Sequence, residues 1–291
     1  MATTLSRTSG RSESSVRVGP RVGKALLIAM MIIMALLTIF PIYWVFTLAT
    51  NSTAEIYSSP PPLWFGDNLL ENHDILTDNV PFWRSVWNST YISIMAMITT
   101  LFFCSIGGFG FAMYEFRFKN ALFAFVLVTL MIPAVLNVIP YFVIIKIFGW
   151  IDTPRALWVP GMANAFGIFL MRQFIASSMP KNLMDAARID GASEFRIYWS
   201  VVLPLIRPAI GTLGLLTFIT SWNSFLIPLV VLKQDITYTI PVTLRNLQGT
   251  YVTDWGAIML GAALAILPLL IIFFMASKQI IEGLTQGAVK G

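Results

Sequence analysis

The 291-residue chain contains few charged residues, one cysteine and one histidine. Asp, Glu, Lys and Arg make up 11% of it, against about one-quarter of an ordinary soluble domain. Because 57% of the residues are hydrophobic and the mean hydropathy is +0.76, the composition excludes that class. The single Cys104 excludes a disulfide framework, and His73 lies in a polar segment where a lone histidine is usually only solvated. We therefore predict no metal site.

Long apolar runs occupy most of the chain instead. Residues 25–49 contain no charged residue, and roughly 20 residues suffice for an α-helix to cross a bilayer. Helices are expected because a helix satisfies its own backbone hydrogen bonds in lipid. Apolar length and bounding charges predict six spans, at about 25–49, 87–113, 121–145, 156–177, 209–232 and 256–276. The predicted fold class is an all-α membrane protein with six transmembrane helices.

The positions of the basic residues predict the orientation in the membrane. With six spans, 14 of the 19 Lys and Arg residues fall on the side of the N-terminus and five on the other side. Basic residues accumulate in cytoplasmic loops, so both termini are predicted to be cytoplasmic in a prokaryotic-type plasma membrane. This asymmetry accounts for the net charge of +5, and no nucleic-acid partner is expected. The first apolar run is too long for a cleaved signal peptide and is interpreted as an uncleaved anchor.

Composition divides the chain into five segments. Residues 1–20, rich in Ser, Arg and Gly, are expected to form a disordered cytoplasmic N-terminus. Residues 51–86 form the longest extracytoplasmic segment, which is either a docking edge for an extracytoplasmic protein or an aromatic anchor at the membrane interface. The other segments are a first transmembrane helix at 21–50, a core at 87–277 with a charged loop at 178–208, and a cytoplasmic tail at 278–291.

Glycines and prolines inside the core predict how its helices pack. Gly107, Gly108 and Gly110 favour close helix approach in the second span. A proline inside a helix frees a carbonyl and kinks the chain, which favours bent helices around a cavity over irregular packing. Such prolines occur in the third, fifth and sixth spans: Pro133, Pro140, Pro228 and Pro268.

The energy source for any transport is absent from this chain. Arg172 is the only charged residue within the predicted spans, and it lies near a helix end where its side chain can reach water. Ion-coupled carriers generally keep ionisable groups near the middle of the membrane, so this class is disfavoured. Residues 19–25 resemble a phosphate-binding loop only loosely and lack the Ser or Thr that would hold magnesium. We predict no catalytic residue and no cofactor, and therefore not an enzyme.

The charged loop at 178–208 predicts two short helices joined by a sharp turn. The first helix is expected to run from Met179 or Pro180 to Ala187. Gly191 permits a turn that a side chain would resist. Ser193 and Glu194 favour the start of a second helix, by capping and by the helix dipole respectively.

The first of these helices has features of a contact surface for another protein. Ala186 and Ala187 are small enough to let a helix enter a cleft, and Asp185 offers a charge to a basic partner residue. The alternative is an amphipathic helix that lies on the membrane and touches only lipid. Residue type alone leaves both interpretations open.

The spacing of the loop resembles the cytoplasmic EAA loop of ABC importer permeases. Asp185-Ala186-Ala187 is followed after three residues by Gly191, and after nine more by Val201-Val202-Leu203-Pro204. Trp222-Asn223-Ser224-Phe225 and the C-terminal residues 283–291 resemble the carbohydrate-uptake, maltose-transporter-like, binding-protein-dependent branch. In two places the chain departs from that pattern, because Asp185 replaces the usual Glu and Ser224 the usual acid.

The resemblance implies the ABC type I importer permease fold and a full importer for a sugar or oligosaccharide. Its partners would be a second permease subunit, an ABC ATPase dimer that binds ATP and magnesium, and an extracytoplasmic solute-binding protein. The tail, expected to be extended, would reach between the ATPase subunits. Alternatives are a permease for a non-sugar polar solute or an ion-coupled secondary transporter. The implied ATPase-coupling residues lie within 180–204: Lys181, Met184, Asp185, Ala186, Ala187, Asp190, Gly191, Ala192, Leu203 and Pro204.

Uncharged polar residues at middle depth are the candidates for the substrate path. An aromatic face beside amide groups suits a sugar, whose ring stacks while its hydroxyls donate and accept hydrogen bonds. The alternative is that these side chains only bond across helices. The candidates are Asn137, Asn164, Trp222, Asn223 and Ser224.

Overall fold

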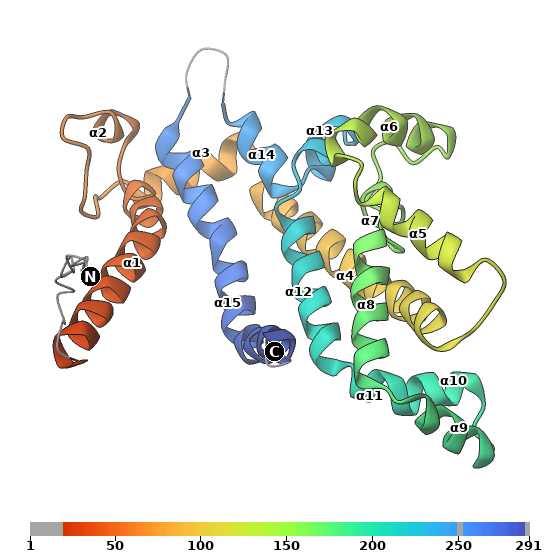
Figure 1. The fold of residues 1–291 in the computed structure, drawn as a ribbon. Helices are drawn as coiled ribbons and strands as arrows, with labels where there is room; N and C mark the ends of the chain where they lie inside the picture. The colour runs from red at the N-terminus through yellow and green to blue at the C-terminus, as the bar shows by residue number, and fades with distance from the viewer. Residues whose placement is uncertain (1–19, 249–252, 289–291) are drawn as a thin grey trace, which may run out of the picture. The chain divides into compact units, whose positions relative to one another are not determined.

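The computed structural model describes residues 20–248 and 253–288, and the described residues are helical apart from loops and one isolated bridge between Gln248 and Thr253 (Figure 1). This confirms the all-α prediction. The chain divides into two units, residues 1–45 and 46–291, and each is described by itself. The predicted disordered N-terminus lies outside the described residues except for Pro20.

The helices follow one another along the chain with short connections. Their bounds are α1 Pro20–Leu48, α2 Thr53–Ile56, α3 Leu69–Asn79, α4 Phe82–Met113, α5 Lys119–Thr129, η1 Ala134–Asn137, α6 Val138–Ile147, α7 Arg155–Trp158, α8 Ala165–Ser178, α9 Lys181–Ile189, α10 Glu194–Ile197, η2 Tyr198–Val202, α11 Leu203–Leu205, α12 Arg207–Trp222, α13 Leu226–Val231, η3 Asp235–Thr237, α14 Ile240–Asn246 and α15 Trp255–Ala288. The segment η2 is a π-helix, and the other two η segments are 3-10 helices.

Three of the helices are long and apolar enough to cross a membrane by themselves. They contain the segments Gly23–Leu48, Phe82–Met113 and Trp255–Met275, which correspond to the first, second and sixth predicted spans. Helix α15 continues through Ala288, so residues 278–288 of the tail are helical. The sequence analysis expected an extended tail. Each added residue of a helix contributes a backbone hydrogen bond, and no proline follows Pro268 to interrupt it.

The third predicted span is broken. Helices Lys119–Thr129 and Ala134–Ile147 meet at 96°, and Pro133, which cannot donate a backbone hydrogen bond, precedes the second piece. The fifth predicted span contains α12 and α13, which residues 223–225 separate.

The fourth predicted span contains α7 and α8, and α8 has only 14 residues. Among the described residues three single helices could cross the membrane. The number rises to five if two bent pairs each count as one span: Lys119–Thr129 with Ala134–Ile147, and Glu194–Leu205 with Arg207–Trp222, which meet at 80°. The number six therefore stays a prediction.

Within residues 46–291, helix α4 packs against α8 and α12 (Figure 1). A Cβ at Gly108 would lie 2.5 Å from Met171 Cβ, and a Cβ at Gly167 would lie 2.6 Å from Cys104 Sγ. Only glycine permits this approach of α4 and α8, as the sequence predicts for Gly108. Cys104 and Met171 are fully buried at this contact. Helix α4 also contacts η2 toward one end, through Ser105, and η3 and α14 toward the other, through Asn88 and Ser89.

Candidate functional site: an elbow and a cavity

The charged loop folds into an elbow, residues 180–204. Helix α9 ends in a Schellman arrangement, in which Gly191 N–H donates to the Arg188 carbonyl and Ala192 N–H to the Ala187 carbonyl, both at 3.0 Å. Gly191 has φ +79°, a conformation that favours glycine, so the predicted sharp turn is present. Ser193 then caps α10 by accepting a hydrogen bond from Arg196 N–H at 3.4 Å.

The elbow buries one side of α9 and exposes the other. Met184 is 3% exposed and packs with the core residues Met171 and Ile175, whereas Asp185 and Ala186 are exposed. Ala187, Ala192 and Leu203 are half-buried, and Asp190, Gly191 and Pro204 are exposed. The side chain of Lys181 lies outside the described residues.

The elbow also exposes a large apolar side chain that the sequence analysis missed. Ile189, at the end of α9, is 86% exposed, more than most apolar side chains in the described residues. Its signal in the sequence is an isoleucine between two charged residues, Arg188 and Asp190. Because Ile189 lies on the exposed side of α9 with Ala186, it joins the candidate contact residues of the elbow.

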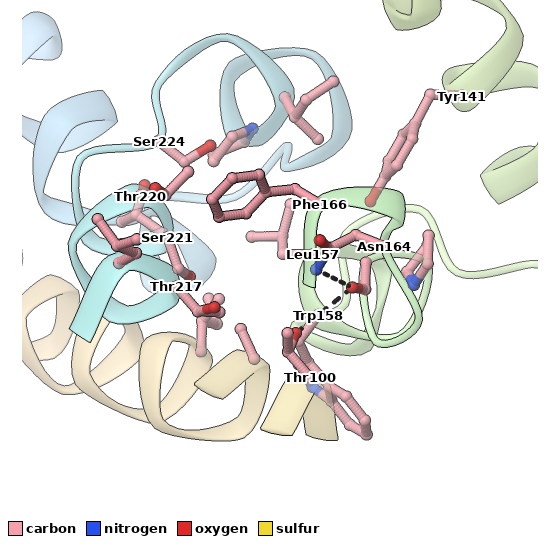
Figure 2. Close-up of a pocket in the computed structure, with 18 of the residues that line it drawn as sticks. Thr100, Tyr141, Leu157, Trp158, Asn164, Phe166, Thr217, Thr220, Ser221 and Ser224 are labelled. Atoms are coloured by element: carbon pink, nitrogen blue, oxygen red, sulfur yellow. Dashed lines mark hydrogen bonds between the residues drawn. The ribbon is translucent and has the colours of Figure 1, made fainter. Parts of the chain in front are cut away.

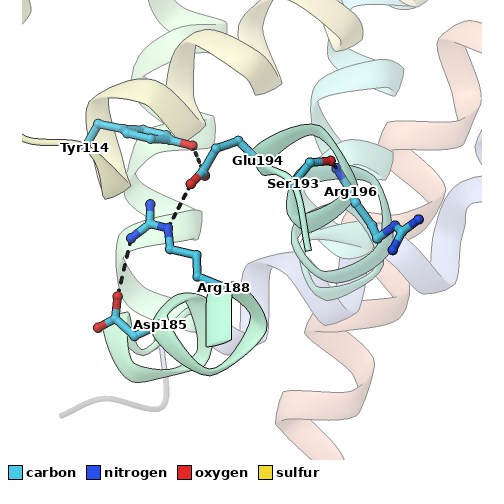
Figure 3. A network of polar contacts seen from close by, with 6 residues as sticks. All are labelled: Tyr114, Asp185, Arg188, Ser193, Glu194 and Arg196. Carbon is cyan, nitrogen blue, oxygen red and sulfur yellow. Dashed lines mark hydrogen bonds and ion pairs between the residues drawn. The ribbon is translucent and has the colours of Figure 1, made fainter. Parts of the chain in front are cut away.

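A network of polar side chains ties the elbow together and links it to the end of α4 (Figure 3). Arg188 Nε lies 2.8 Å from Glu194 Oε1, and an Arg188 terminal nitrogen lies 3.3 Å from Asp185 Oδ1. The Tyr114 hydroxyl donates a hydrogen bond to Glu194 Oε2. Asp185, interpreted from the sequence as a charge for a partner, therefore already has a partner within its own helix.

The network changes the acidity of its members. The Arg188 hydrogen bond, and then the Tyr114 hydroxyl, hold the pKa of Glu194 below its ordinary value. Burial, and then the hydrogen bond to the Glu194 carboxylate, raise the pKa of Tyr114 to about 12. Glu194 is therefore ionised and Tyr114 protonated at neutral pH, as the hydrogen bond between them requires.

A cavity of about 580 Å³ lies among α4, α6, α7, α8, α12 and α13 (Figure 2). No charged side chain lines it, and hydroxyl and aromatic groups face it beside aliphatic ones. The lining residues are Ile92, Ala96, Thr100, Tyr141, Leu157, Trp158, Pro160, Gly161, Asn164, Phe166, Leu213, Leu216, Thr217, Thr220, Ser221, Ser224, Ile227, Pro228 and Thr239.

Two of the predicted path residues, Asn164 and Ser224, line this cavity. Asn164 also begins α8, because its Oδ1 accepts from Gly167 N–H at 2.8 Å while its Nδ2 donates to the Gly161 carbonyl at 3.2 Å. The Gly161 carbonyl accepts a second hydrogen bond from Thr100 Oγ1 at 3.4 Å. The amide of Asn164 is therefore held in one orientation at the cavity wall.

The other three predicted path residues do not line the cavity. Trp222 is 3% exposed, stacks on Phe218 and donates from Nε1 to the Ala265 carbonyl at 3.2 Å. The Asn223 amide donates to the Ile219 carbonyl of its own helix at 3.0 Å, and Asn137 is exposed in η1. For Trp222 this contact is the bonding across helices that the sequence left open, whereas the Asn223 contact stays within one helix.

The sequence analysis missed a row of hydroxyls on α12. Thr217, Thr220 and Ser221 line the cavity with Ser224, at spacings of three, four and seven residues from the first. The spacing of Thr217, Thr220 and Ser221 puts these three on one face of α12 and could have revealed them, while Ser224 lies in the break after the helix. Aromatic side chains were missed too, since Trp158 and Phe166 lie far from any motif in the sequence.

An aspartate ties two loops together near the cavity. The Asp152 carboxylate accepts hydrogen bonds from Lys233 N–H at 2.8 Å and Thr237 Oγ1 at 2.5 Å, and from two donors of Gln234. Burial raises the pKa of Asp152, but the hydrogen bonds from Thr237, Lys233 and Gln234 outweigh it, so that the net shift is downward. This contact connects the segment before α7 to the one after α13, and both helices contribute cavity residues.

The described residues contain no group of three or more His, Cys, Asp or Glu side chains that could hold a metal ion. Comparison with known protein families matches residues 105–284 to the family described as binding-protein-dependent transport system inner membrane component. The chain belongs to this family. It is therefore a multi-pass plasma membrane protein and a transport permease, and the family predicted from the elbow spacing is confirmed.

Three relatives of this chain are named as transport system permease proteins. The chain is 33% identical over 260 residues to the arabinooligosaccharides transport system permease protein AraQ of Halalkalibacterium halodurans, covering 88% of this chain and 93% of that protein. It is 33% identical over 256 residues to the lactose transport system permease protein LacG of Rhizobium radiobacter, covering 88% and 92%. It is 30% identical over 265 residues to the sn-glycerol-3-phosphate transport system permease protein UgpE of Escherichia coli O1:K1 / APEC, covering 88% and 94%.

A solved structure has the same fold. It is a chain of a bacterial ABC transporter involved in the import of the acidic polysaccharide alginate, with a TM-score of 0.76 and 23% identity. The match covers 93% of this chain and 99% of that chain. The predicted ABC importer permease fold is confirmed by this similarity.

Proposed function

We propose that this family member forms half of the translocation path of an ATP-driven importer for a neutral sugar or oligosaccharide. Its partners are a second permease, a dimer of ATPase subunits that bind ATP and magnesium, and an extracytoplasmic solute-binding protein. The observation that carries the choice of solute is the cavity, whose lining offers hydroxyls and aromatic rings without a charged side chain.

The cavity lining suits the chemistry of a sugar. The hydroxyls of Thr217, Thr220 and Ser221 both donate and accept hydrogen bonds, as sugar hydroxyls do. The rings of Tyr141 and Phe166 provide apolar faces on which the C–H face of a pyranose can pack. A second permease subunit would complete the path on the open side.

The absence of charge in this lining argues against an anionic solute. A phosphate or carboxylate that leaves water needs Arg, Lys or several backbone N–H groups to replace its hydration. One relative is named for sn-glycerol-3-phosphate and two for neutral sugars. The chemistry of the cavity favours the neutral class for this chain.

The elbow would be the contact with the ATPase. Helix α9 exposes Asp185, Ala186 and Ile189 on one side while Met184 anchors the other side in the core. Small, charged and apolar groups on one exposed face fit a groove on a soluble protein better than they fit lipid. In this arrangement the elbow receives the movement that ATP hydrolysis generates.

Purification and mass spectrometry test this proposal. Tagged full-length chain extracted from its native membranes in mild detergent should retain a second permease and an ATPase. The binding protein of the same system should carry a neutral sugar. Purification without any ATPase would overturn the importer assignment, and an anionic solute on the binding protein would overturn the choice of sugar.

A further inference from the structure

We infer that Tyr114, Glu194 and Arg188 form a joint that fastens the coupling helix α9 to α4, so that movement of the elbow displaces a wall of the cavity. The inference rests on the proposed function, because it concerns how the movement received at the elbow reaches the solute path. Tyr114 would be a positioning residue that touches neither solute nor ATPase.

Glu194 is the centre of the joint because its two carboxylate oxygens bind two different elements. Oε1 accepts from Arg188 Nε of α9 at 2.8 Å, and Oε2 accepts from the hydroxyl of Tyr114 (Figure 3). The Arg188 guanidinium also lies 6.0 Å from the centre of the Tyr114 ring. One carboxylate therefore binds two residues from different parts of the chain: Tyr114, which is 80 residues from Glu194, and Arg188, which is six residues from it.

Apolar packing alone fixes α9 on one side only. Met184 is the buried residue of α9, and Ala187 is partly buried beside it. The Schellman turn at Gly191 orders the backbone between α9 and α10 but makes no backbone hydrogen bond to α4. The Arg188–Glu194–Tyr114 contacts add a second attachment one turn further along α9, and two attachments prevent a helix from pivoting about one.

Helix α4 extends from the joint to the cavity without interruption. Tyr114 directly follows α4 and donates its N–H to the Gly110 carbonyl at 3.3 Å. The same helix contributes Ile92, Ala96 and Thr100 to the cavity. A rigid helix transmits a displacement of one end to the other.

A second contact ties α4 to the elbow from inside the core. The hydroxyls of Ser105 and Tyr198 lie 2.7 Å apart and are buried. Ser105 is in α4 and Tyr198 begins η2, the segment that follows α10. Because the buried contact persists, the loss of the exposed joint should loosen α9 without separating α10 from α4.

Distances between spin labels in the full chain, purified with its accompanying subunits, test the joint. One label replaces Asn182, an exposed residue of α9, and the other replaces Arg117, three residues beyond Tyr114. The distance is measured by electron paramagnetic resonance before and after trapping with Mg-ATP and vanadate. In the parent complex we expect one narrow distance in both states, because α9 and the end of α4 move together.

In Tyr114→Phe and Glu194→Gln we expect the label-to-label distance to be no longer narrow and no longer the same in both states. Each variant removes a contact of the joint with little change of volume, so we expect a broadened distance that changes on nucleotide trapping. The matched controls are Arg196→Gln, which removes a charge of α10 outside the network, and Tyr91→Phe, which removes an exposed hydroxyl of α4. Both should behave as the parent.

Exchange of the charged partners provides a rescue. Arg188→Glu combined with Glu194→Arg restores the ion pair, and it should narrow the distance again relative to Arg188→Glu alone. Tyr114→Phe removes one hydrogen bond to a partly exposed carboxylate and leaves the Arg188–Glu194 ion pair in place, so we expect only about a two- to fivefold fall in solute moved per ATP.

Two results would overturn the joint: a parent distance that changes on trapping as much as in Tyr114→Phe, or variants that keep the narrow distance. Failure of the proposed function has a different outcome, because then no ATPase accompanies the chain and no nucleotide is trapped. Loss of the ATPase from Tyr114→Phe alone would also reject the joint, since it would make Tyr114 part of the ATPase contact.

Discussion

At the elbow, Arg188 forms ion pairs with Asp185 and Glu194 that remain partly exposed to water, whereas no charged side chain lines the cavity. An ion pair that keeps contact with water costs little desolvation and can exchange partners during a cycle. An uncharged hydroxyl surface binds and releases a polar solute without trapping an ion. In the proposed importer, charge is therefore placed where the ATPase would act and is absent where the solute would pass.

Overpacking the helix that joins the two regions should have the largest effect. A Cβ at Gly108 would lie 2.5 Å from Met171 Cβ and 2.7 Å from the backbone nitrogen of Arg172, so Gly108→Val forces α4 and α8 apart. We expect destabilisation of about 1–3 kcal/mol or more, measured as a lower Tm in detergent and reduced accumulation in membranes. Gly110→Val is the control, because nothing lies within 4 Å of its Cβ. Equal Tm values for the two variants would contradict the tight packing.

Gly191→Val tests whether backbone strain at the elbow lowers transport. The left-handed backbone at φ +79° disfavours a β-branched residue, so the Schellman turn and the elbow should distort. We expect transport to fall by roughly tenfold or more, since about 1–2 kcal/mol of strain falls on the coupling helix itself. The measurement is solute uptake per assembled complex in membrane vesicles.

Gly149→Val is the matched control for this prediction. Gly149 has φ +65° and nothing within 4 Å of its Cβ, as at Gly191, but it lies between α6 and α7, away from the elbow. Both variants should lower Tm by a similar amount, and only Gly191→Val should uncouple ATP hydrolysis from uptake. Equal uptake in the two variants would remove the special role of the elbow.

Removal of a single hydroxyl from the cavity lining should have a moderate effect on solute affinity. Thr217→Val keeps the shape and removes a group that faces the cavity, so we expect the apparent affinity for a neutral sugar to fall about three- to tenfold. Thr212→Val is the control on the same helix, because Thr212 donates to the Pro208 carbonyl and does not line the cavity. Competition binding or uptake at several concentrations measures the difference, and unchanged affinity in Thr217→Val would sink the assignment of this helix face.

The smallest effect concerns pH and the Asp152 contact. The pKa of Asp152 is lower than its usual 3.8, so its contribution to stability is present above pH 3.8 and is lost as the pH falls below that value. Asp152→Asn, which also tolerates the local φ of +60°, should lower Tm slightly at neutral pH and flatten its dependence on acid pH. A Tm-versus-pH profile that is identical in the two proteins would show that Asp152 stays protonated or unbound.

Much of the elbow could be predicted from the sequence because its signals are local. The turn at Gly191 and the cap at Ser193 depend on residues within a few positions, and both lie where the sequence put them. The link from Glu194 to Tyr114 could not be predicted, since 80 residues separate them and only the packing of α4 brings them together.

The cavity was predicted less well because polar residue types were chosen one at a time. Trp222 and Asn223 belong to a recognisable local motif, yet their side-chain nitrogens donate to the carbonyls of Ala265 and Ile219. The hydroxyl face of α12 depends on which side of the helix faces the cavity, and that is a property of the packed bundle. Likewise Pro133 predicts a kink in the third span, but the residue type does not predict an angle as large as 96°.

Burial of the lone thiol has a practical consequence. Cys104 is fully enclosed between α4 and α8, with its sulfur beside the Met162 and Asn164 carbonyls. Maleimide reagents should therefore leave the folded parent protein unlabelled while reacting with a cysteine introduced on its surface. The native chain is thus its own low-background host for site-by-site accessibility mapping, which would also establish directly which loops face each side of the membrane.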